Sequence, residues 1–230
     1  MTGMYAATAI LAGIAHREQS GRGQYIDLGL LDTTVTMMAV MNMNYLVSGL
    51  PPGRSGNAHP NIVPYEVFRC ADGHLILAVG NDGQFAKFCE VAGKPEWATD
   101  PRFARNVDRV KNRPALVPLV AEAMRTRTRH AWLAALEAVG VPCGPINTVN
   151  QVFADPQIAA RGMGFDLPHP LASTVPQAGN PLKFSATPVV YGRSSPLLGE
   201  HTLPVLRECL GMSDAQLSGL AARGIIGVRK

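Results

Sequence analysis

The first 32 residues constrain the fold most, because they predict a helix, a strand and a second helix with no lead-in. Apolar residues recur at helical spacing across Met4–Ile14, with Thr2 as the expected N-cap and Gly21 as the expected stop. A strand is predicted at Gln24–Leu28. The second helix follows it with the stripe Leu31, Thr34, Met38, Met41 and Tyr45. This unit is typical of an internal part of an α/β fold. We therefore expect an earlier part of the fold before residue 1.

Size and composition set the broad class. The chain has 230 residues, enough for one large or two small domains, and its 47% hydrophobic residues suffice for a core. A formal charge of +4 suits a cytoplasmic protein that handles anionic small molecules, and it is too small to indicate nucleic-acid binding. No apolar run is long enough to span a membrane. The scattered cysteines, Cys70, Cys89, Cys143 and Cys209, indicate reduced thiols and not a disulfide framework or a zinc site.

Beyond the opening unit the pattern indicates a second, smaller domain. A loop rich in proline and glycine, Ser48–Pro60, comes first. Tyr65–Arg69 and His74–Val79, joined by a short turn, predict a hairpin, and a helix is expected from Gln84. Strands that alternate with helices favour α/β or α+β, with the small domain running from about residue 63 to 161.

Capping residues predict further helix starts. Asp100-Pro101 and Asp155-Pro156 each combine an N-cap with a proline at the first helical position. Thr128 is expected to cap a helix, and a short helix is expected after Ser213.

Four separated segments resemble one family. They are Thr2–Asp32, Gly80–Phe85, Gly140–Pro145 and Pro196–Thr202. Each segment alone is a weak signal. Together, in this order and spacing, they resemble class III CoA-transferases, the CaiB/BaiF group that includes formyl-CoA and succinyl-CoA-dependent transferases. The resemblance covers essentially the whole chain.

The resemblance implies a Rossmann-like CoA-binding domain plus a smaller α/β domain, with two subunits threaded as interlocked rings. Family members are longer than this chain. We therefore expect residues 1–62 to be the remaining part of an incomplete Rossmann-like domain with its linker, 63–161 the small α/β domain, and 162–230 a segment that returns to the large domain. The implied substrates are an acyl-CoA thioester and a carboxylic acid. No permanently bound cofactor, metal, membrane or nucleic acid is expected.

The family's nucleophile is an aspartate, and the resemblance places it immediately before the helix that begins at Thr2. It is therefore expected upstream of residue 1, and no catalytic residue is assigned within the chain. Thr2 and Gly3 would form the helix end that faces this carboxylate, because free N–H groups and the helix dipole stabilise negative charge there. Asp27 and Asp32 are interpreted as structural.

The loop Gly53–Pro60 occupies the position of the family's mobile glycine-rich loop, which covers the reacting acyl group. Gly53 and Gly56 would give mobility, and backbone N–H groups stabilise developing oxyanions. The sequence departs from the family's glycine tetrad at Asn57, Ala58 and His59, which leaves the identity of the substrate open. His59 is a candidate contact for an acceptor carboxylate, or else a cap in an ordinary linker.

Asp82 bears on the choice between two reactions. Related α-methylacyl-CoA racemases carry a glutamate near this position, paired with an upstream histidine and aspartate for proton transfer. The run Asn81–Gln84 has the transferase form instead. Asp82 is otherwise interpreted as an N-cap or Asx turn before the next helix.

The remaining conspicuous residues are interpreted as structural. Four arginines near one helical face are expected to be solvated, with CoA phosphates as the alternative: Arg102, Arg105, Arg109 and Arg113. Four methionines are expected to fill the core: Met37, Met38, Met41 and Met43. Cys143 lies in a rigid turn without a placed histidine. Glu200-His201 is interpreted as a loop that ends at Thr202 as a helix cap.

Three functions remain in view. The leading one is the C-terminal portion of a CoA-transferase that acts through an aspartyl acyl-anhydride. The alternatives are a racemase-like isomerase and a non-catalytic fragment that binds or dimerises. Half of a Rossmann-like domain leaves helix faces uncovered, so we expect the chain to associate with a partner or with itself.

Overall fold

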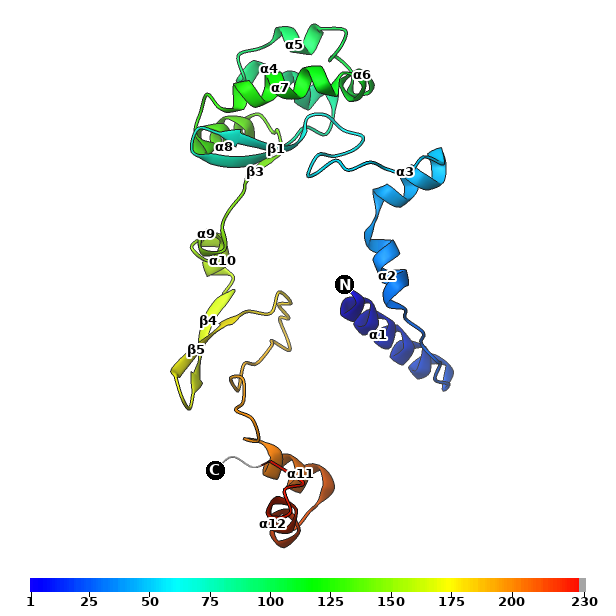
Figure 1. The fold of residues 1–230 in the computed structure, drawn as a ribbon, viewed down its shortest axis with the longest axis vertical. Coiled ribbons are helices and arrows are strands. Elements are labelled where there is room, and N and C mark those ends of the chain that lie inside the picture. The colour runs from blue at the N-terminus through cyan, green and yellow to red at the C-terminus, as the bar shows by residue number, and fades with distance from the viewer. Residues whose placement is uncertain (228–230) are drawn as a thin grey trace. The chain divides into compact units, whose positions relative to one another are not determined.

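The computed structural model describes residues 1–227 (Figure 1), and the chain divides into two units, one of Met1–Pro145 and one that begins at Ile146. The elements of the first unit are α1 (Thr2–Ser20), α2 (Leu30–Met37), α3 (Val40–Ser48), β1 (Tyr65–Cys70), β2 (Gly73–Ala78), α4 (Asp82–Val91), α5 (Glu96–Thr99), α6 (Asn106–Lys111), α7 (Arg113–Met124), α8 (Arg129–Ala138) and β3 (Cys143–Pro145). The fold is a mixture of helices and strands, as expected.

The first helix is confirmed, with one correction at its start. Gly21 ends α1 in the left-handed conformation, with φ of 70°, and its N–H donates to the Arg17 carbonyl. Met1 takes the N-cap position, so the prediction that Thr2 is the cap was wrong. The Thr2 hydroxyl lies instead 2.8 Å from the Thr33 hydroxyl of α2. None of the residues of α1 is buried.

Two predictions in the next segment were also wrong. Residues 24–28 do not form a strand, because a strand needs a neighbour to pair with and none of the described residues pairs there. The single helix predicted from Leu31 to Tyr45 is broken into α2 and α3, with Ala39 between them at φ of 46°.

The hydrophobic core of the first unit lies between Val63 and Val141. Strands β1 and β2 form the predicted antiparallel hairpin, in which Cys70 pairs with Gly73, and β3 pairs antiparallel with β2. Figure 1 shows the helices α7 and α8 beside this three-stranded sheet, and α4 packs against α8. The side chains that they bury include Phe85, Phe88, Leu116, Val120, Trp132 and Leu136.

Helix caps in the first unit follow the sequence in part. Thr128 caps α8 as predicted, accepting a hydrogen bond from the Ala131 N–H. The cap of α4 is Asn81, whose side chain accepts from the Gln84 N–H. Asp82 is the first helical residue, so its interpretation as the N-cap was wrong. Asp100-Pro101 opens a turn and not a helix, because Asp100 already ends α5.

The second unit is built from short elements. They are α9 (Val149–Phe153), α10 (Pro156–Ala160), β4 (Gly164–His169), β5 (Ser173–Ala178), α11 (Thr202–Leu210) and α12 (Asp214–Ala222). Strands β4 and β5 form an antiparallel pair. Asp155 caps α10 as predicted, and Ser213 caps α12. His201 takes the cap position of α11, so the expectation for Thr202 was wrong by one residue.

All four cysteines are free thiols, as the sequence indicates. Cys70 and Cys89 are buried, and burial raises the pKa of the Cys89 thiol to about 12. Among residues 1–227, no helix combines the length and the apolar character needed to cross a membrane.

The exposed apolar side chains of residues 1–48 generate a prediction about association. Met4, Leu11, Leu31 and Leu46 are each more than 65% exposed. Because exposure of this much apolar surface is unfavourable in water, we expect the purified chain to self-associate. Sedimentation velocity at micromolar concentration should give a mass above 24.5 kDa. A folded monomer under these conditions would contradict the expectation.

Candidate functional site

The loop between α3 and β1 contains the residues that the sequence assigns to the substrate, and it has two parts. Residues 53–56, here called the free turn, have few contacts. The Ala58 N–H donates to the Ser55 carbonyl at 3.0 Å, and a Cβ added at Gly53 or Gly56 would meet no atom within 4 Å. Gly56 has a φ of 59°, which favours glycine. Residues 57–63, here called the anchored segment, are held by many hydrogen bonds.

Asn57 and His59 both belong to the anchored segment. The Asn57 side-chain oxygen accepts a hydrogen bond from the Val67 N–H of β1 at 2.9 Å. The His59 N–H donates to the Tyr65 carbonyl at 2.8 Å, and the two rings stack with centroids 5.3 Å apart. The His59 Nδ1 accepts from the Asn61 N–H at 3.1 Å. These contacts place both side chains against β1. Their binding of substrate stays a prediction.

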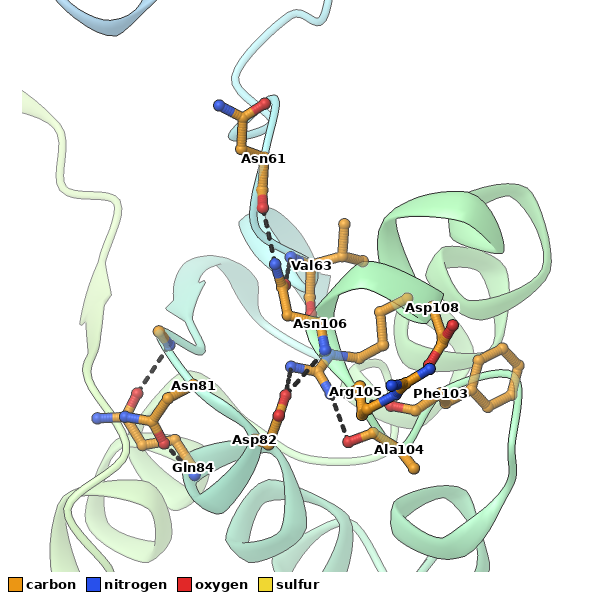
Figure 2. Close-up of polar contacts among 12 residues, drawn as sticks. Asn61, Val63, Asn81, Asp82, Gln84, Phe103, Ala104, Arg105, Asn106 and Asp108 are labelled. Atoms are coloured by element: carbon orange, nitrogen blue, oxygen red, sulfur yellow. Dashed lines mark hydrogen bonds and ion pairs between the residues drawn. The ribbon is translucent and has the colours of Figure 1, made fainter.

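Asn106, at the start of α6, holds the end of the anchored segment. Its side-chain nitrogen donates to the Asn61 carbonyl at 2.8 Å, and its side-chain oxygen accepts from the Val63 N–H at 3.2 Å. Its own backbone N–H donates to Asp82 Oδ1 at 2.9 Å. Figure 2 shows Asn106 between Asn61, Val63 and Asp82. Through its side chain and its backbone N–H together, Asn106 therefore joins the anchored segment to α4 and α6.

The guanidinium of Arg109 lies beneath this contact and is fully buried. Its Nε donates to the Val63 carbonyl at 2.6 Å, and its Nη2 donates to Asp82 Oδ1 at 2.7 Å. Its Nη1 donates to the carbonyls of Phe103 and Ala104. The guanidinium carbon also lies 4.4 Å from the centre of the Phe85 ring, where the ring face attracts a cation.

Arg113 forms a second contact with the anchored segment. Its Nη2 donates to the His59 carbonyl at 2.6 Å and to the Pro60 carbonyl at 3.2 Å. Its Nη1 lies 3.6 Å from Glu66 Oε1. Burial raises the pKa of the Glu66 carboxyl, and the nearby Arg113 charge opposes that rise.

A pocket of about 800 Å³ lies along the loop within the first unit. Its lining includes the apolar side chains of Met41, Met43 and Val47 and the guanidinium groups of Arg54 and Arg113. The pocket is therefore largely apolar, with two arginines among its lining residues. Its position beside the free turn makes it the candidate place for the acyl part of a substrate.

Two groups of residues differ from their sequence interpretation. The four arginines do not share a solvated face: Arg102 and Arg105 are exposed and pair with neighbouring aspartates, Arg109 is buried, and Arg113 is half-buried. The methionines do not fill the core, since Met37, Met38 and Met43 are each more than half exposed. No described residue covers them fully, so the apolar stripe found in the sequence stays in contact with solvent.

The remaining predicted residues do not line the pocket described above. Thr2 and Gly3 are at the start of α1, where a Cβ added at Gly3 would meet no atom within 4 Å. Asp27 and Asp32 are both exposed, and Asp32 lies in the first turn of α2. Glu200 accepts a hydrogen bond from the Leu197 N–H within its own turn, consistent with a structural interpretation.

Sequence reasoning missed the residues that hold the loop, namely Asn61, Asn106, Arg109 and Arg113. Both Asn106 and Arg109 bond to backbone groups of residues 61–63, which lie more than 40 residues away and leave no local pattern. The sequence did single out Asp82, and its carboxylate is the charged partner of the buried Arg109 guanidinium.

Replacing Arg109 by methionine should lower the free energy of unfolding of the first unit. The change would leave the buried carbonyls of Val63 and Phe103 without donors, each worth about 1–3 kcal/mol. We expect a loss of about 3 kcal/mol or more in the free energy of unfolding, measured by urea titration of tryptophan fluorescence. Arg105→Met is the matched control and should cost under about 1 kcal/mol, because its pair with Asp108 is on the surface. Equal losses in the two variants would refute the role given to Arg109.

Comparison with known proteins agrees with this architecture. The sequence pattern of CoA-transferase family III matches residues 1–202. The chain is 46% identical over 207 residues to a succinate–glutarate CoA-transferase of Agrobacterium fabrum, covering 90% of this chain and 52% of the relative. It is 34% identical over 225 residues to a human succinyl-CoA:glutarate CoA-transferase, covering 98% and 51%.

A crystal structure of a CaiB/BaiF family protein from Brucella suis matches with a TM-score of 0.72 and 45% identity, over 90% of this chain and 53% of that one. The chain thus spans about half the length of the relatives that it matches. With the family pattern present across most of its residues, the chain belongs to CoA-transferase family III.

Proposed function

We propose that this chain supplies part of an enzyme that moves CoA from an acyl-CoA thioester to a carboxylic acid. The observation that carries the proposal is its 46% identity, over 90% of its length, to a protein named succinate–glutarate CoA-transferase. The pocket beside the free turn supports it, because such a reaction needs a space for the acyl group next to a source of backbone N–H groups.

The proposed chemistry requires a carboxylate nucleophile. The carboxylate attacks the thioester carbon, the C–S bond breaks, and the CoA thiolate leaves an enzyme-bound acyl anhydride. The acceptor carboxylate then attacks the acyl carbonyl, which frees the enzyme carboxylate and gives a mixed anhydride of the two acids. The CoA thiolate attacks the acceptor carbonyl of this anhydride, and the donor acid leaves as its carboxylate. We assign no residue of this chain as the nucleophile. The family resemblance places that aspartate before Thr2, where the start of α1 would stabilise its charge.

The substrates that we propose are dicarboxylic acids and their CoA thioesters. The names of two relatives include succinate or succinyl-CoA and glutarate, which each carry a second carboxylate. Arg54 and Arg113 line the apolar pocket, and a guanidinium is suited to a carboxylate. We further propose the interlocked homodimer and the cytoplasmic location that the family resemblance implies.

The contacts of Asp82 argue against the racemase alternative. Its Oδ1 accepts hydrogen bonds from Arg109 and from the Asn106 N–H, which commits the group to holding the loop. A proton-transferring acid at this position would need to face the substrate α-carbon.

A chimera tests the proposed function. It joins the N-terminal segment of the Agrobacterium fabrum relative, which this chain does not match, to the complete chain. We expect the chimera to convert succinyl-CoA and glutarate to glutaryl-CoA, measured by liquid chromatography, and the chain alone to give no product. Hydroxylamine should trap an acyl-enzyme in the chimera only, because the nucleophile is expected in the added segment.

The same proteins separate the alternatives. A folded chimera without transferase activity would overturn the proposal. An acyl-enzyme formed by the chain alone would show that the nucleophile lies within it. Deuterium incorporation at the α-carbon of a 2-methylacyl-CoA, without any acceptor acid, would favour the isomerase.

Replacing Arg54 by methionine in the chimera tests the choice of dicarboxylic acids. We expect the KM for glutarate to rise about tenfold, because one charge-assisted hydrogen bond to the second carboxylate is lost. The KM for butyrate, which lacks that carboxylate, should stay the same. Arg22→Met, an exposed change outside the pocket, is the control. An equal effect of Arg54→Met on both acids would contradict the assignment.

A further inference from the structure

The anchored segment is held at both polar atoms of one backbone unit. The Val63 N–H donates to the Asn106 side chain, and the Val63 carbonyl accepts from the buried Arg109. Two residues earlier, the Asn61 carbonyl accepts from the same Asn106 side chain. The Asn106 amide therefore binds the backbone on both sides of Ile62, much as a neighbouring strand would, although it comes from a helix.

The free turn joins directly onto this segment. A residue adds at most about 3.6 Å to the reach of a chain, so Ser55 can lie no further than about 7 Å from Asn57. The Arg113 guanidinium fixes the carbonyls of His59 and Pro60, and Asn57 accepts from β1. The position of the free turn above the pocket is thereby set by the contacts of residues 57–63.

We propose that Asn106 is a positioning residue for the transfer reaction: by holding Asn61 and Val63, it sets where the free turn presents its backbone N–H groups to the reacting acyl group. This inference rests on the proposed function. Asn106 itself lies outside the lining of the pocket and acts through the loop backbone.

Asn106 is a better test of this role than Arg109. Arg109 is fully buried, and its loss removes donors from the core, so folding and positioning would change together. Asn106 is only half-buried, and among residues 1–227 the hydrogen bonds of its side chain go to the anchored segment. Asn112 provides a matched control, because its side chain also donates two hydrogen bonds in this region, to the carbonyls of Arg102 and Asp108 and not to the loop.

The first measurement is amide hydrogen exchange in the complete chain. In Asn106→Ala we expect exchange of the amides of residues 57–63 to speed up about tenfold, as expected for loss of about 1.4 kcal/mol of local protection. Exchange at Leu75 and Leu77 of the core strand β2 should not change. Asn112→Ala should leave residues 57–63 as they are. Unchanged exchange of residues 57–63 in Asn106→Ala would overturn the inference.

The second measurement is steady-state kinetics in the chimera described above. We expect Asn106→Ala to lower kcat by about tenfold to a hundredfold, because a small displacement of groups around the reacting atoms has effects of this size. The KM for succinyl-CoA should stay within about twofold, since Asn106 does not line the pocket. A variant with a normal kcat, or one in which only KM rises, would overturn the inference.

Asn106→Asp guards against a loss of folding in the alanine variant. It keeps the size of the side chain and an acceptor for the Val63 N–H, but it turns an oxygen toward the Asn61 carbonyl. We expect faster exchange at residues 57–63 and a lower kcat here too, and a normal kcat would count against the proposal. If the folded chimera with Asn106 intact is inactive, the proposed function fails and the inference with it. An active parent chimera whose variants are unaffected refutes the inference alone.

Discussion

The first unit depends on the hydrogen bonds made by the buried guanidinium of Arg109. Removing a charge from water is costly, and such a group persists only where hydrogen bonds replace its hydration. Here the carbonyls of Val63, Phe103 and Ala104 and the carboxylate of Asp82 supply those bonds. These acceptors come from the entry to β1, from the turn after α5 and from α4. Burying one cation thus fixes the relative positions of elements that share no regular hydrogen bonding.

The need to satisfy Arg109 explains why the anchored segment has many hydrogen bonds and the free turn has few. The carbonyl of Val63 is needed by Arg109, so the chain just before β1 cannot move without exposing a buried donor. Asn106 and Arg113 extend the same restraint back to residue 59. Nothing comparable holds Gly53 or Gly56, where an added Cβ would meet no atom within 4 Å. The many contacts of the anchored segment, and the few contacts of the free turn, both follow from the hydrogen bonding of the buried Arg109.

The sequence predicted the features whose causes are local. Gly21 ends α1, and Thr128 caps α8, because each acts through backbone groups within a few residues. The strand at 24–28 failed because pairing needs a neighbour, which the described residues do not supply. The interpretation of Arg109 as a solvated side chain was wrong for a different reason. Its spacing from other arginines resembles a solvated helix face, whereas the Val63 carbonyl and the Asp82 carboxylate that it binds come from distant parts of the sequence.

The loop is held by a neutral side chain, while the pocket beside it is lined by arginines. Asn106 holds the loop with an amide, which adds no charge near the pocket. The cation of Arg109 is balanced by Asp82, and that of Arg113 lies 3.6 Å from Glu66. The described residues give Arg54 no acidic partner. Its charge is consequently available to an anion within roughly a Debye length of 8–10 Å, and the proposed preference for dicarboxylic acids rests on this.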